Sequence, residues 1–430
     1  MKKISGRPGA KFQQFNLADA DSSARYGTTT GRPRLTAMIP LIALARRISP
    51  LLGAWLVALS GGRLSLLVAR LLRLRRLAGA MLHGGLTPPP PVRLQVETTD
   101  VCNLRCIHCK REKLEDMNTL TMPLDAFART ITDIEPFYVT LAGFGEPLID
   151  RTIIDKLSFL HRRDICTSLP TNGTYIRHKR EALAAELPNI LQLSIDGATE
   201  QTFEAIRKRG DFGKIIENYR AICALRADGN TRPHTIIRVF CALQRGNLHD
   251  YRAMYRLIGT LRGIDSFGLV PVSHGSISST QVPARDEVLA LHREIDLAIT
   301  EAQDEDEKAF YRQWRAVSAE WLRGDGRARP EPETNHAPCT VPWFSSYIDA
   351  KGRVYPCCYL TGTGQVMGVL NKDGSGFDEI WTGPRYRAFR SDLVSARAKL
   401  EGCRACPRND TKVLSTLRSI RPLLPAADRH

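Results

Sequence analysis

The chain has 430 residues, which suggests two domains, and its 43% hydrophobic and 25% charged residues are those of a soluble globular protein. The first 34 residues are polar and basic without an apolar stretch, which argues against a secretory signal peptide. We therefore expect a cytoplasmic protein whose eleven cysteines are thiols or metal ligands. The net charge of +16 is uneven, because residues 1–90 hold 14 Lys and Arg against two acidic residues, which leaves +4 for the remaining 340.

The N-terminal quarter of the chain differs from the rest. Residues 1–34 lack hydrophobic periodicity and are predicted to be a disordered basic tail. Residues 35–91 are rich in Leu, Ala and Arg and end in four consecutive prolines, so we predict a basic amphipathic helical region and a stiff linker. Its uncharged stretches, 35–45 and 48–62, fall short of the ~20 apolar residues that span a bilayer.

Three interpretations of this helical region remain open. On a helical wheel, one side carries Arg63, Arg70 and Arg73. The opposite side carries Leu64, Val68 and Leu72. Such a helix can lie in a membrane interface, which predicts peripheral contact with the inner face of the membrane through residues 35–82. Alternatively, the helix packs on the protein with its arginines extended outward. As a third option it docks an acidic partner; nucleic acid, the other ligand of a basic surface, is not expected.

After the proline linker, strand and helix patterns alternate. The candidate strands are Arg93–Glu97, Tyr138–Ala142, Ile165–Leu169, Ile190–Ile195, Thr235–Ala242 and Ser266–Val272. The candidate helices are Leu124–Ile134, Ile149–Arg162, Ile176–Glu186, Glu200–Arg226 (broken at Gly210–Gly213) and Leu248–Leu261. This alternation indicates right-handed βαβ units and a parallel sheet, so we predict an α/β barrel over residues 92–275. A helical connector (276–335), a small Cys-rich domain (336–410) and a tail (411–430) are expected to follow.

Three cysteines lie close together after the first strand. Cys102, Cys106 and Cys109 have the spacing C-x3-C-x2-C. A 4Fe-4S cluster commonly takes four cysteines, so three thiolates leave one iron able to bind a small molecule. Zinc is the alternative, although it normally takes four ligands in closely spaced pairs. The triplet resembles the signature of the radical S-adenosylmethionine (SAM) family, with His108 in the place where the family has an aromatic residue or His.

The resemblance implies a partial (β/α)6 TIM-like barrel whose strand ends hold SAM. Gly143–Pro147 follows the second strand and resembles the family's Gly-Gly-Glu-Pro motif, with Phe144 in place of the second glycine. Gly143, Gly145 and Glu146 are thereby expected to line the methionine end of SAM, since glycine permits close approach of backbone to ligand. An ordinary turn is the alternative for this stretch.

Further SAM contacts are expected at other strand ends. The resemblance implies that Ser194 and Asp196 bind the ribose and that His108 packs near the adenine. Arg238 in the fifth strand is a candidate partner for the methionine carboxylate, or else a structural residue. Thr171–Gly173 closes the third strand, so special residues follow four successive strands, where parallel barrels place their chemistry.

A second group of thiols lies near the C-terminus. Cys339, Cys357, Cys403 and Cys406 resemble the first part of the SPASM or twitch extension of radical SAM proteins, with Gly352 in a predicted hairpin turn. Because no cysteine follows Cys406, we expect one auxiliary 4Fe-4S cluster; Cys358 is a spare thiol. A structural zinc ribbon is the alternative.

The family resemblance implies an enzyme that cleaves SAM reductively to a 5′-deoxyadenosyl radical and abstracts a substrate hydrogen. The auxiliary cluster would then assist oxidation or another modification, with a flavodoxin- or ferredoxin-type protein as electron donor. His274 and Asp265 are candidate bases. Small-molecule, lipid-linked and peptide substrates all remain open, and the leucine- and arginine-rich region favours a carbohydrate or lipid type. The competing function is a non-catalytic iron–sulfur or zinc scaffold.

Overall fold

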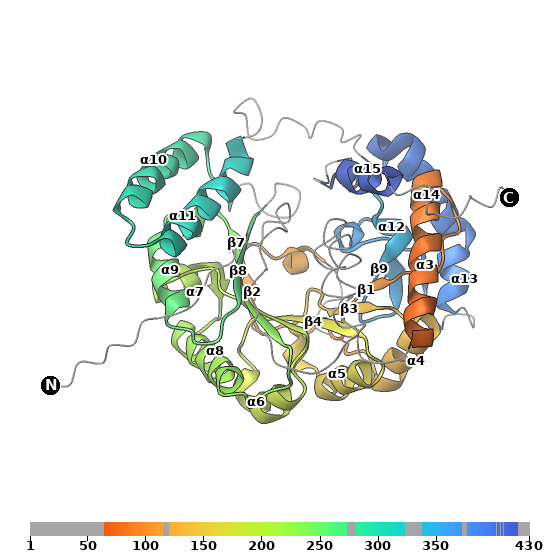
Figure 1. Cartoon of the computed structure of the whole chain (residues 1–430), viewed down its shortest axis with the longest axis horizontal. Helices are drawn as coiled ribbons and strands as arrows, with labels where there is room; N and C mark the ends of the chain where they lie inside the picture. The colour runs from red at the N-terminus through yellow and green to blue at the C-terminus, as the bar shows by residue number, and fades with distance from the viewer. Residues whose placement is uncertain are drawn as a thin grey trace.

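The computed structural model describes residues 64–114, 120–272, 281–322, 338–371, 376–400, 402–404, 406 and 408–419. Its centre is a nine-stranded sheet with the strand order β11-β10-β9-β1-β3-β4-β5-β7-β8 (Figure 1). The predicted disordered tail, the first part of the predicted amphipathic region and His274 lie outside the described residues.

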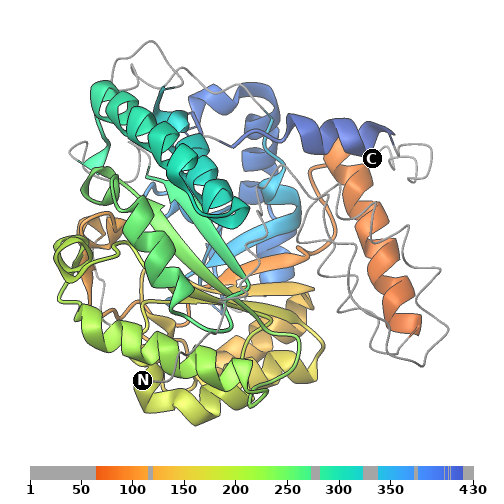
Figure 2. The ribbon, with the colours of Figure 1, turned by 60° about the vertical axis from the view of Figure 1, so that its left-hand side comes forward.

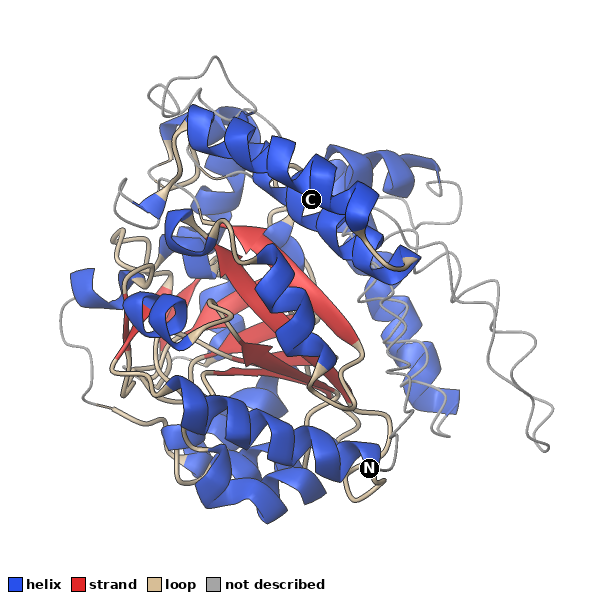
Figure 3. Cartoon of the chain, turned by 90° about the vertical axis from the view of Figure 1, so that its left-hand side faces the viewer, coloured by secondary structure: helices blue, strands red, loops and turns tan. Residues whose placement is uncertain are grey.

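Six strands of this sheet run parallel and form the predicted partial barrel. They are β1 (Arg93–Val96), β3 (Tyr138–Leu141), β4 (Cys166–Thr171), β5 (Ile190–Ser194), β7 (Ile236–Leu243) and β8 (Ser266–Pro271). Helices cover its outer side (Figure 3): α4 (Leu124–Ile134), α5 (Ile153–Arg162), α6 (Ile176–Ala185), α7 (Glu200–Ile206), α8 (Phe212–Ala227) and α9 (Tyr251–Gly259). The predicted (β/α)6 order is therefore confirmed.

One predicted helix is divided differently from the expectation. The helical pattern from Glu200 ends at Ile206, where the short strand β6 (Arg207–Lys208) begins, so the break comes before Gly210. Strand β6 pairs antiparallel with β2 (Arg105–Cys106) in the cysteine loop. A long-range strand pair thus ends α7, which helical periodicity alone does not reveal.

The C-terminal cysteine-rich region continues the barrel sheet. Strand β9 (Ser345–Ile348) pairs parallel with β1, and β10 (Arg353–Tyr355) and β11 (Gly368–Val369) follow in antiparallel order. The predicted hairpin turn is confirmed, with Gly352 at a φ of +75°. Strand β9 covers an edge of β1 that would otherwise expose unpaired backbone groups. The remaining helices of this region are α12 (Val341–Phe344), α13 (Phe377–Thr382), α14 (Pro384–Ala396) and α15 (Thr411–Ser419).

The connector between barrel and cysteine-rich region is helical, as its charge pattern predicts. Helices α10 (Arg285–Glu301) and α11 (Glu305–Ser318) pack together, and α11 also contacts α9 and β8. Trp314 is fully buried, stacks on Phe267 at a ring distance of 6.3 Å, and donates its Nε1–H to the Leu248 carbonyl at 3.0 Å. Short 3-10 segments complete the chain at Lys110–Lys113, Pro147–Ile149, Arg245–Asn247, Ala319–Leu322, Cys358–Leu360 and Arg397–Lys399.

Helix α3 (Leu64–His83) packs on the protein, as in the second of the three interpretations, but its Arg70 and Arg73 side chains point inward instead of outward. It lies beside the C-terminal helices and packs against α12 and α15 (Figure 2). Arg70 and Arg73 face inward, each 5.2 Å from the centre of the Phe137 ring, and Arg73 also donates to the carbonyl of Pro90 at 2.8 Å. Leu72 on the supposed apolar face is 54% exposed. A guanidinium group can donate several hydrogen bonds to the carbonyls at the end of a helix or in a linker. These hydrogen bonds favour an inward orientation of the arginines, which the helical wheel did not predict. No helix within the described ranges is both long and apolar enough to cross a membrane.

The proline linker is held by the C-terminal region. Trp343 donates its Nε1–H to the Gly85 carbonyl at 2.7 Å, and Trp381 donates to the Pro88 carbonyl at 3.1 Å. Arg390 is fully buried and donates to the Leu86 carbonyl at 2.8 Å. These contacts fix the start of β1 against the cysteine-rich region, so that barrel and extension share one packed interface.

Candidate active site

The cysteine triplet lies in the loop that follows β1. The three thiols lie within electrostatic range of one another, and the N–H of Cys109 donates to the Cys106 carbonyl at 3.0 Å. Burial raises the pKa of the Cys102 thiol and raises that of Cys106 to about 12, while Arg207 opposes the shift at Cys106. Buried thiols of this kind become thiolates when a metal cluster supplies positive charge. The donor set therefore fits an iron–sulfur cluster.

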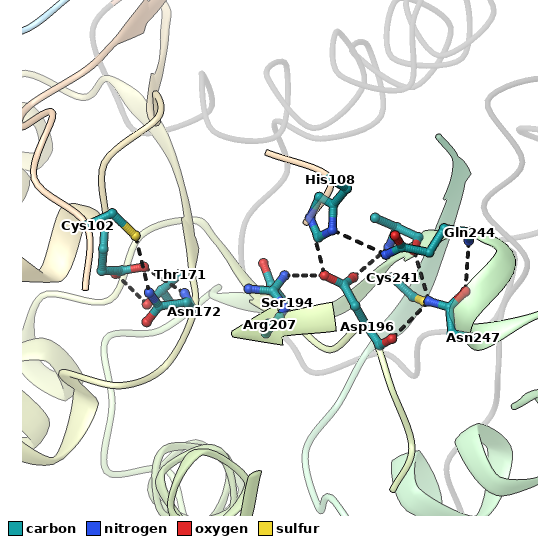
Figure 4. A network of polar contacts seen from close by, with 12 residues as sticks. Cys102, His108, Thr171, Asn172, Ser194, Asp196, Arg207, Cys241, Gln244 and Asn247 are labelled. Atoms are coloured by element: carbon teal, nitrogen blue, oxygen red, sulfur yellow. Dashed lines mark hydrogen bonds and ion pairs between the residues drawn. The ribbon is translucent and has the colours of Figure 1, made fainter. Parts of the chain in front are cut away.

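The end of β4 holds this loop in place. Asn172 donates its Nδ2–H to Cys102 Sγ at 3.9 Å and to Asn103 Oδ1 at 3.2 Å (Figure 4). Thr174 donates its hydroxyl to the same Asn103 oxygen at 3.2 Å. The strand-end motif Thr171–Gly173 thus orients a predicted cluster ligand, a role for which the sequence offered only its position after a strand.

The two glycines of the second strand-end motif are required by the chain itself. A Cβ on Gly143 would lie 2.2 Å from Glu97 Oε1, and a Cβ on Gly145 would lie 2.0 Å from the Thr99 carbonyl oxygen. The sequence interpretation was close approach to SAM. In the structure the loops after β1 and β3 lie against each other at these points: Gly143 approaches the Glu97 side chain, and Gly145 approaches the Thr99 backbone.

Glu146 connects the loop after β3 to the end of β4. It is buried, and its carboxylate accepts hydrogen bonds from Thr171 Oγ1 at 2.7 Å, from the Asn172 N–H at 2.7 Å and from the Leu148 N–H at 3.1 Å. Burial raises the pKa of Glu146, and these hydrogen bonds oppose the shift. Because its oxygens are occupied by β4 and the following segment, Glu146 positions the loop and does not point at a ligand.

A buried polar network surrounds His108. Asp196 is 1% exposed; it pairs with Arg207 at 2.7 Å, and its second oxygen accepts from the Ala242 N–H at 2.7 Å (Figure 4). His108 Nε2 lies 3.5 Å from Asp196, and its Nδ1 lies 3.2 Å from Gln244 Nε2. Burial lowers the pKa of His108, so the ring is neutral near pH 7.

This network changes the interpretation of the predicted ribose site. Ser194 ends β5, and its carbonyl accepts from the Tyr219 hydroxyl at 3.2 Å. One Asp196 oxygen accepts from the Ala242 N–H, while the other lies 2.7 Å from Arg207 and 3.5 Å from His108 and has no hydrogen-bond partner among the described residues. Sequence reasoning missed Arg207 and Gln244, because β6 and the turn after β7 carry no motif.

Two other predicted residues lie away from the strand ends that carry the cysteine loop. Arg238 lies opposite Ser266, the first residue of β8, and its Nε–H donates to that hydroxyl at 3.3 Å. It is four residues before Ala242, which is about 13 Å along the strand. Asp265 precedes β8 and accepts from Arg226 at 2.7 Å and from the Ile237 N–H at 2.8 Å. Asp265, a candidate base, therefore lies at the end of the barrel opposite to the strand ends that carry the cysteine loop.

The C-terminal thiols lie in one region of the fold, and Cys358 lies within electrostatic range of Cys357 and Cys406. Cys357 lies within electrostatic range of Cys339 and Cys403, and Cys403 within range of Cys406. Burial raises the pKa of Cys339 and of Cys403 to about 11 in each case. Within the described ranges, no three His, Cys, Asp or Glu side chains are placed to hold a single metal ion. In a four-iron cluster each thiolate binds a different iron. The four sulfur atoms are therefore farther apart than they would be around a single metal ion.

Comparison with known proteins agrees with these two thiol sites. A model of the radical SAM superfamily matches residues 96–238, and a model of the SPASM iron–sulfur cluster-binding domain matches residues 339–407. The mycofactocin maturase of Mycobacterium ulcerans is 27% identical over 331 residues, which cover 75% of this chain and 81% of that protein. A GTP 3′,8-cyclase of Clostridium perfringens is 30% identical over 132 residues, 29% of this chain and 40% of that protein.

Solved structures share the fold. Streptococcus suis SuiB bound to its precursor peptide SuiA has a TM-score of 0.52 and 17% identity, covering 82% of this chain and 77% of that chain. Its SAM-bound form also has a TM-score of 0.52, with 79% of that chain covered. A radical SAM domain carries a four-iron cluster that binds SAM, and a SPASM domain carries auxiliary iron–sulfur clusters. The chain therefore contains a radical SAM domain at residues 96–238 and a SPASM iron–sulfur cluster-binding domain at residues 339–407.

Proposed function

We propose that this protein is an enzyme that removes a hydrogen atom from a peptide substrate at the mouth of its partial barrel. Cys102, Cys106 and Cys109 would hold the SAM-binding cluster, and the four C-terminal thiols would hold one auxiliary cluster. When bound, SAM and the reduced cluster supply the one-electron cleavage chemistry that makes hydrogen abstraction possible. Through the auxiliary cluster, the four C-terminal thiols would supply an acceptor or relay for the electron that the substrate radical loses on oxidation.

The chain's own residues would position these groups. Asn172 holds the loop of Cys102, and the neutral His108 ring is fixed between Asp196 and Gln244, next to Cys109 in the chain. A ring held in this way is preorganised to pack on a flat group such as adenine. Ser194, at the end of β5, is the remaining candidate for a ribose contact. Arg207 lies 2.7 Å from the Asp196 carboxylate inside the protein.

The observation that carries this proposal is the joining of both thiol sites to one strand. Strand β1 leads directly into the cysteine triplet, and β9, in the segment with Cys339 and Cys357, pairs with β1 along its full length. Two cysteine sites on neighbouring strands suit electron exchange between a substrate and an auxiliary cluster.

A peptide substrate has the better support. The M. ulcerans relative is a maturase matched over 81% of its length, and the fold is shared with a protein that binds a precursor peptide. The preference for a carbohydrate or lipid substrate rested on the leucine- and arginine-rich region. In α3, Arg70 and Arg73 pack against the protein, which removes that argument for the described part of the region.

The test begins with anaerobic reconstitution. We expect about eight irons per chain, as two four-iron clusters require, and 5′-deoxyadenosine on reduction. Deuterated peptides encoded by genes next to this one should transfer their label into 5′-deoxyadenosine. The control is the variant with Cys102, Cys106 and Cys109 changed to Ala. Zinc in place of iron, with no SAM turnover, would show a non-catalytic scaffold, and label transferred from a sugar instead of a peptide would refute the substrate class.

A further inference from the structure

The outer side of the cysteine loop is lined by a second strand with basic residues. In the β2–β6 pair, Arg105 lies opposite Lys208, and Cys106 lies opposite Arg207. Arg207 is buried and points inward to Asp196, whereas Arg105, Lys208 and the next residue, Arg209, are exposed. Because neighbours across a strand pair share a face, Arg105 and Lys208 project together on the solvent side of the loop that carries Cys106.

A pocket of about 180 Å³ continues this basic surface between the first turns of α6 and α8. Its lining residues are Thr174, Arg177, His178, Arg209, Asp211, Lys214, Ile215, Glu217 and Asn218. The lining carries three basic side chains against the two acidic ones of Asp211 and Glu217, and Asp211 pairs with Lys214 at 2.7 Å. We call the side chains of Arg105, Arg177, Lys208, Arg209 and Lys214 the basic face; all five are exposed.

The pocket wall connects directly to a cluster ligand. Thr174, which lines the pocket, donates its hydroxyl to Asn172 Oδ1 at 2.7 Å, and Asn172 donates to Cys102 Sγ at 3.9 Å. Two hydrogen bonds therefore join Thr174, in the pocket wall, to a cluster thiol. The pocket is lined by residues of α6, of α8 and of the segments that precede them, and both helices lie in the outer layer (Figure 1).

We propose that the basic face docks an acidic one-electron carrier protein, with a flavin or iron–sulfur centre, that reduces the cluster on Cys102, Cys106 and Cys109. The carrier loses one electron and the cluster gains one, with no atom transferred. Charge complementarity speeds such encounters, and the short connection to Cys102 places the donor next to the acceptor. This inference rests on the proposed function, because only a redox-active cluster at the triplet needs a reductant.

The experiment measures cluster reduction in the reconstituted full chain, by anaerobic stopped flow with a reduced bacterial flavodoxin as the probe. We expect flavodoxin to reduce the cluster of the double variant Lys208→Glu and Arg209→Glu at least tenfold more slowly than that of the unaltered protein at low salt. The difference between the two rates should shrink at high salt. Arg177→Glu, on another element, should slow reduction in the same direction. The matched control is Arg293→Glu with Lys412→Glu, exposed residues of α10 and α15, and its rate should be unchanged.

Dithionite separates this inference from the proposed function. Dithionite needs no docking surface, so it should reduce the variants and the unaltered protein equally and support equal 5′-deoxyadenosine formation. A flavodoxin rate that is unaffected by both basic-face variants would overturn the docking proposal and leave the proposed function standing. An altered KM for a peptide substrate with an unchanged flavodoxin rate would also overturn it, by assigning the face to substrate. Loss of product with dithionite in the unaltered protein would instead refute the proposed function.

Discussion

Glu97 accepts a hydrogen bond of 2.6 Å from the backbone N–H of Phe144. Its other carboxylate oxygen accepts from the Ala350 N–H at 3.3 Å, in the turn between β9 and β10. A single buried side chain at the end of β1 thus joins the glycine motif after β3 to the cysteine-rich extension. Any movement of the extension is thereby coupled to the loop that shapes the barrel mouth.

Glu97 should give the protein a specific pH dependence. Burial raises the pKa of Glu97 from 4.5 to about 7, with the two N–H donors opposing the shift. A carboxyl whose pKa is raised on folding contributes stability below pH 4.5, and that contribution is lost as the pH rises to 7. We expect the free energy of unfolding of the unaltered protein, relative to Glu97→Gln, to fall by roughly 3 kcal/mol over this range. Urea unfolding from pH 5 to 8 measures it, and parallel curves for the two proteins would contradict the assignment.

The buried pair of Asp196 and Arg207 should behave as a unit. Asp196→Asn leaves the Arg207 guanidinium buried without its counter-charge, which costs about 3–5 kcal/mol of unfolding free energy. It also removes a contact of His108, so SAM should bind more weakly. Equilibrium unfolding and SAM titration measure the two effects. The double variant with Arg207→Met should recover part of the stability, and a double variant no more stable than Asp196→Asn would show that the ion pair is not the cause.

The two thiol sites should lose iron independently. Cys403→Ala should lower the iron content from about eight to about four per chain and leave the SAM-binding cluster in place. Cys102→Ala should remove SAM cleavage while the auxiliary cluster remains. Cys358→Ala is the matched control, because Cys358 is not among the four expected ligands. Iron analysis with electron paramagnetic resonance checks all three, and loss of iron from Cys358→Ala would mean that the ligand set is different.

A methyl group at Gly145 should destabilise the protein, because the glycine motif leaves no room for a Cβ there. Gly145→Ala would place a Cβ 2.0 Å from the Thr99 carbonyl oxygen. We therefore expect the free energy of unfolding to fall by about 1–3 kcal/mol and SAM to bind more weakly. Gly213→Ala is the matched control, since its Cβ would meet nothing nearer than 3.7 Å and alanine favours a helix. Urea unfolding and SAM titration compare them. Equal stability of the two variants would show that the loop after β3 can move away from β1.

Local patterns predicted the barrel well, because alternation of apolar strands and helices is set by neighbours in sequence. The six parallel strands begin within one residue of their predicted starts, and α4 has its predicted bounds. Helix α7 was predicted too long, because its end depends on the pairing of Arg207 with Cys106, about a hundred residues away. The inward arginines of α3 were missed for the same kind of reason, since the Phe137 ring and the Pro90 carbonyl that receive them belong to other segments.

The sequence by itself determined the chemistry of this protein, since cysteine spacing and strand-end motifs are local and carry the family's signature. Only the tertiary structure decided which polar residues serve that chemistry and how. Burial and hydrogen bonding between distant segments assign Glu146 and Asp196 to protein partners, place Asp265 at the far end of the barrel, and bring Gln244 and Arg207 to the site. Such roles depend on which atoms meet across the fold, and no periodicity along the chain encodes that.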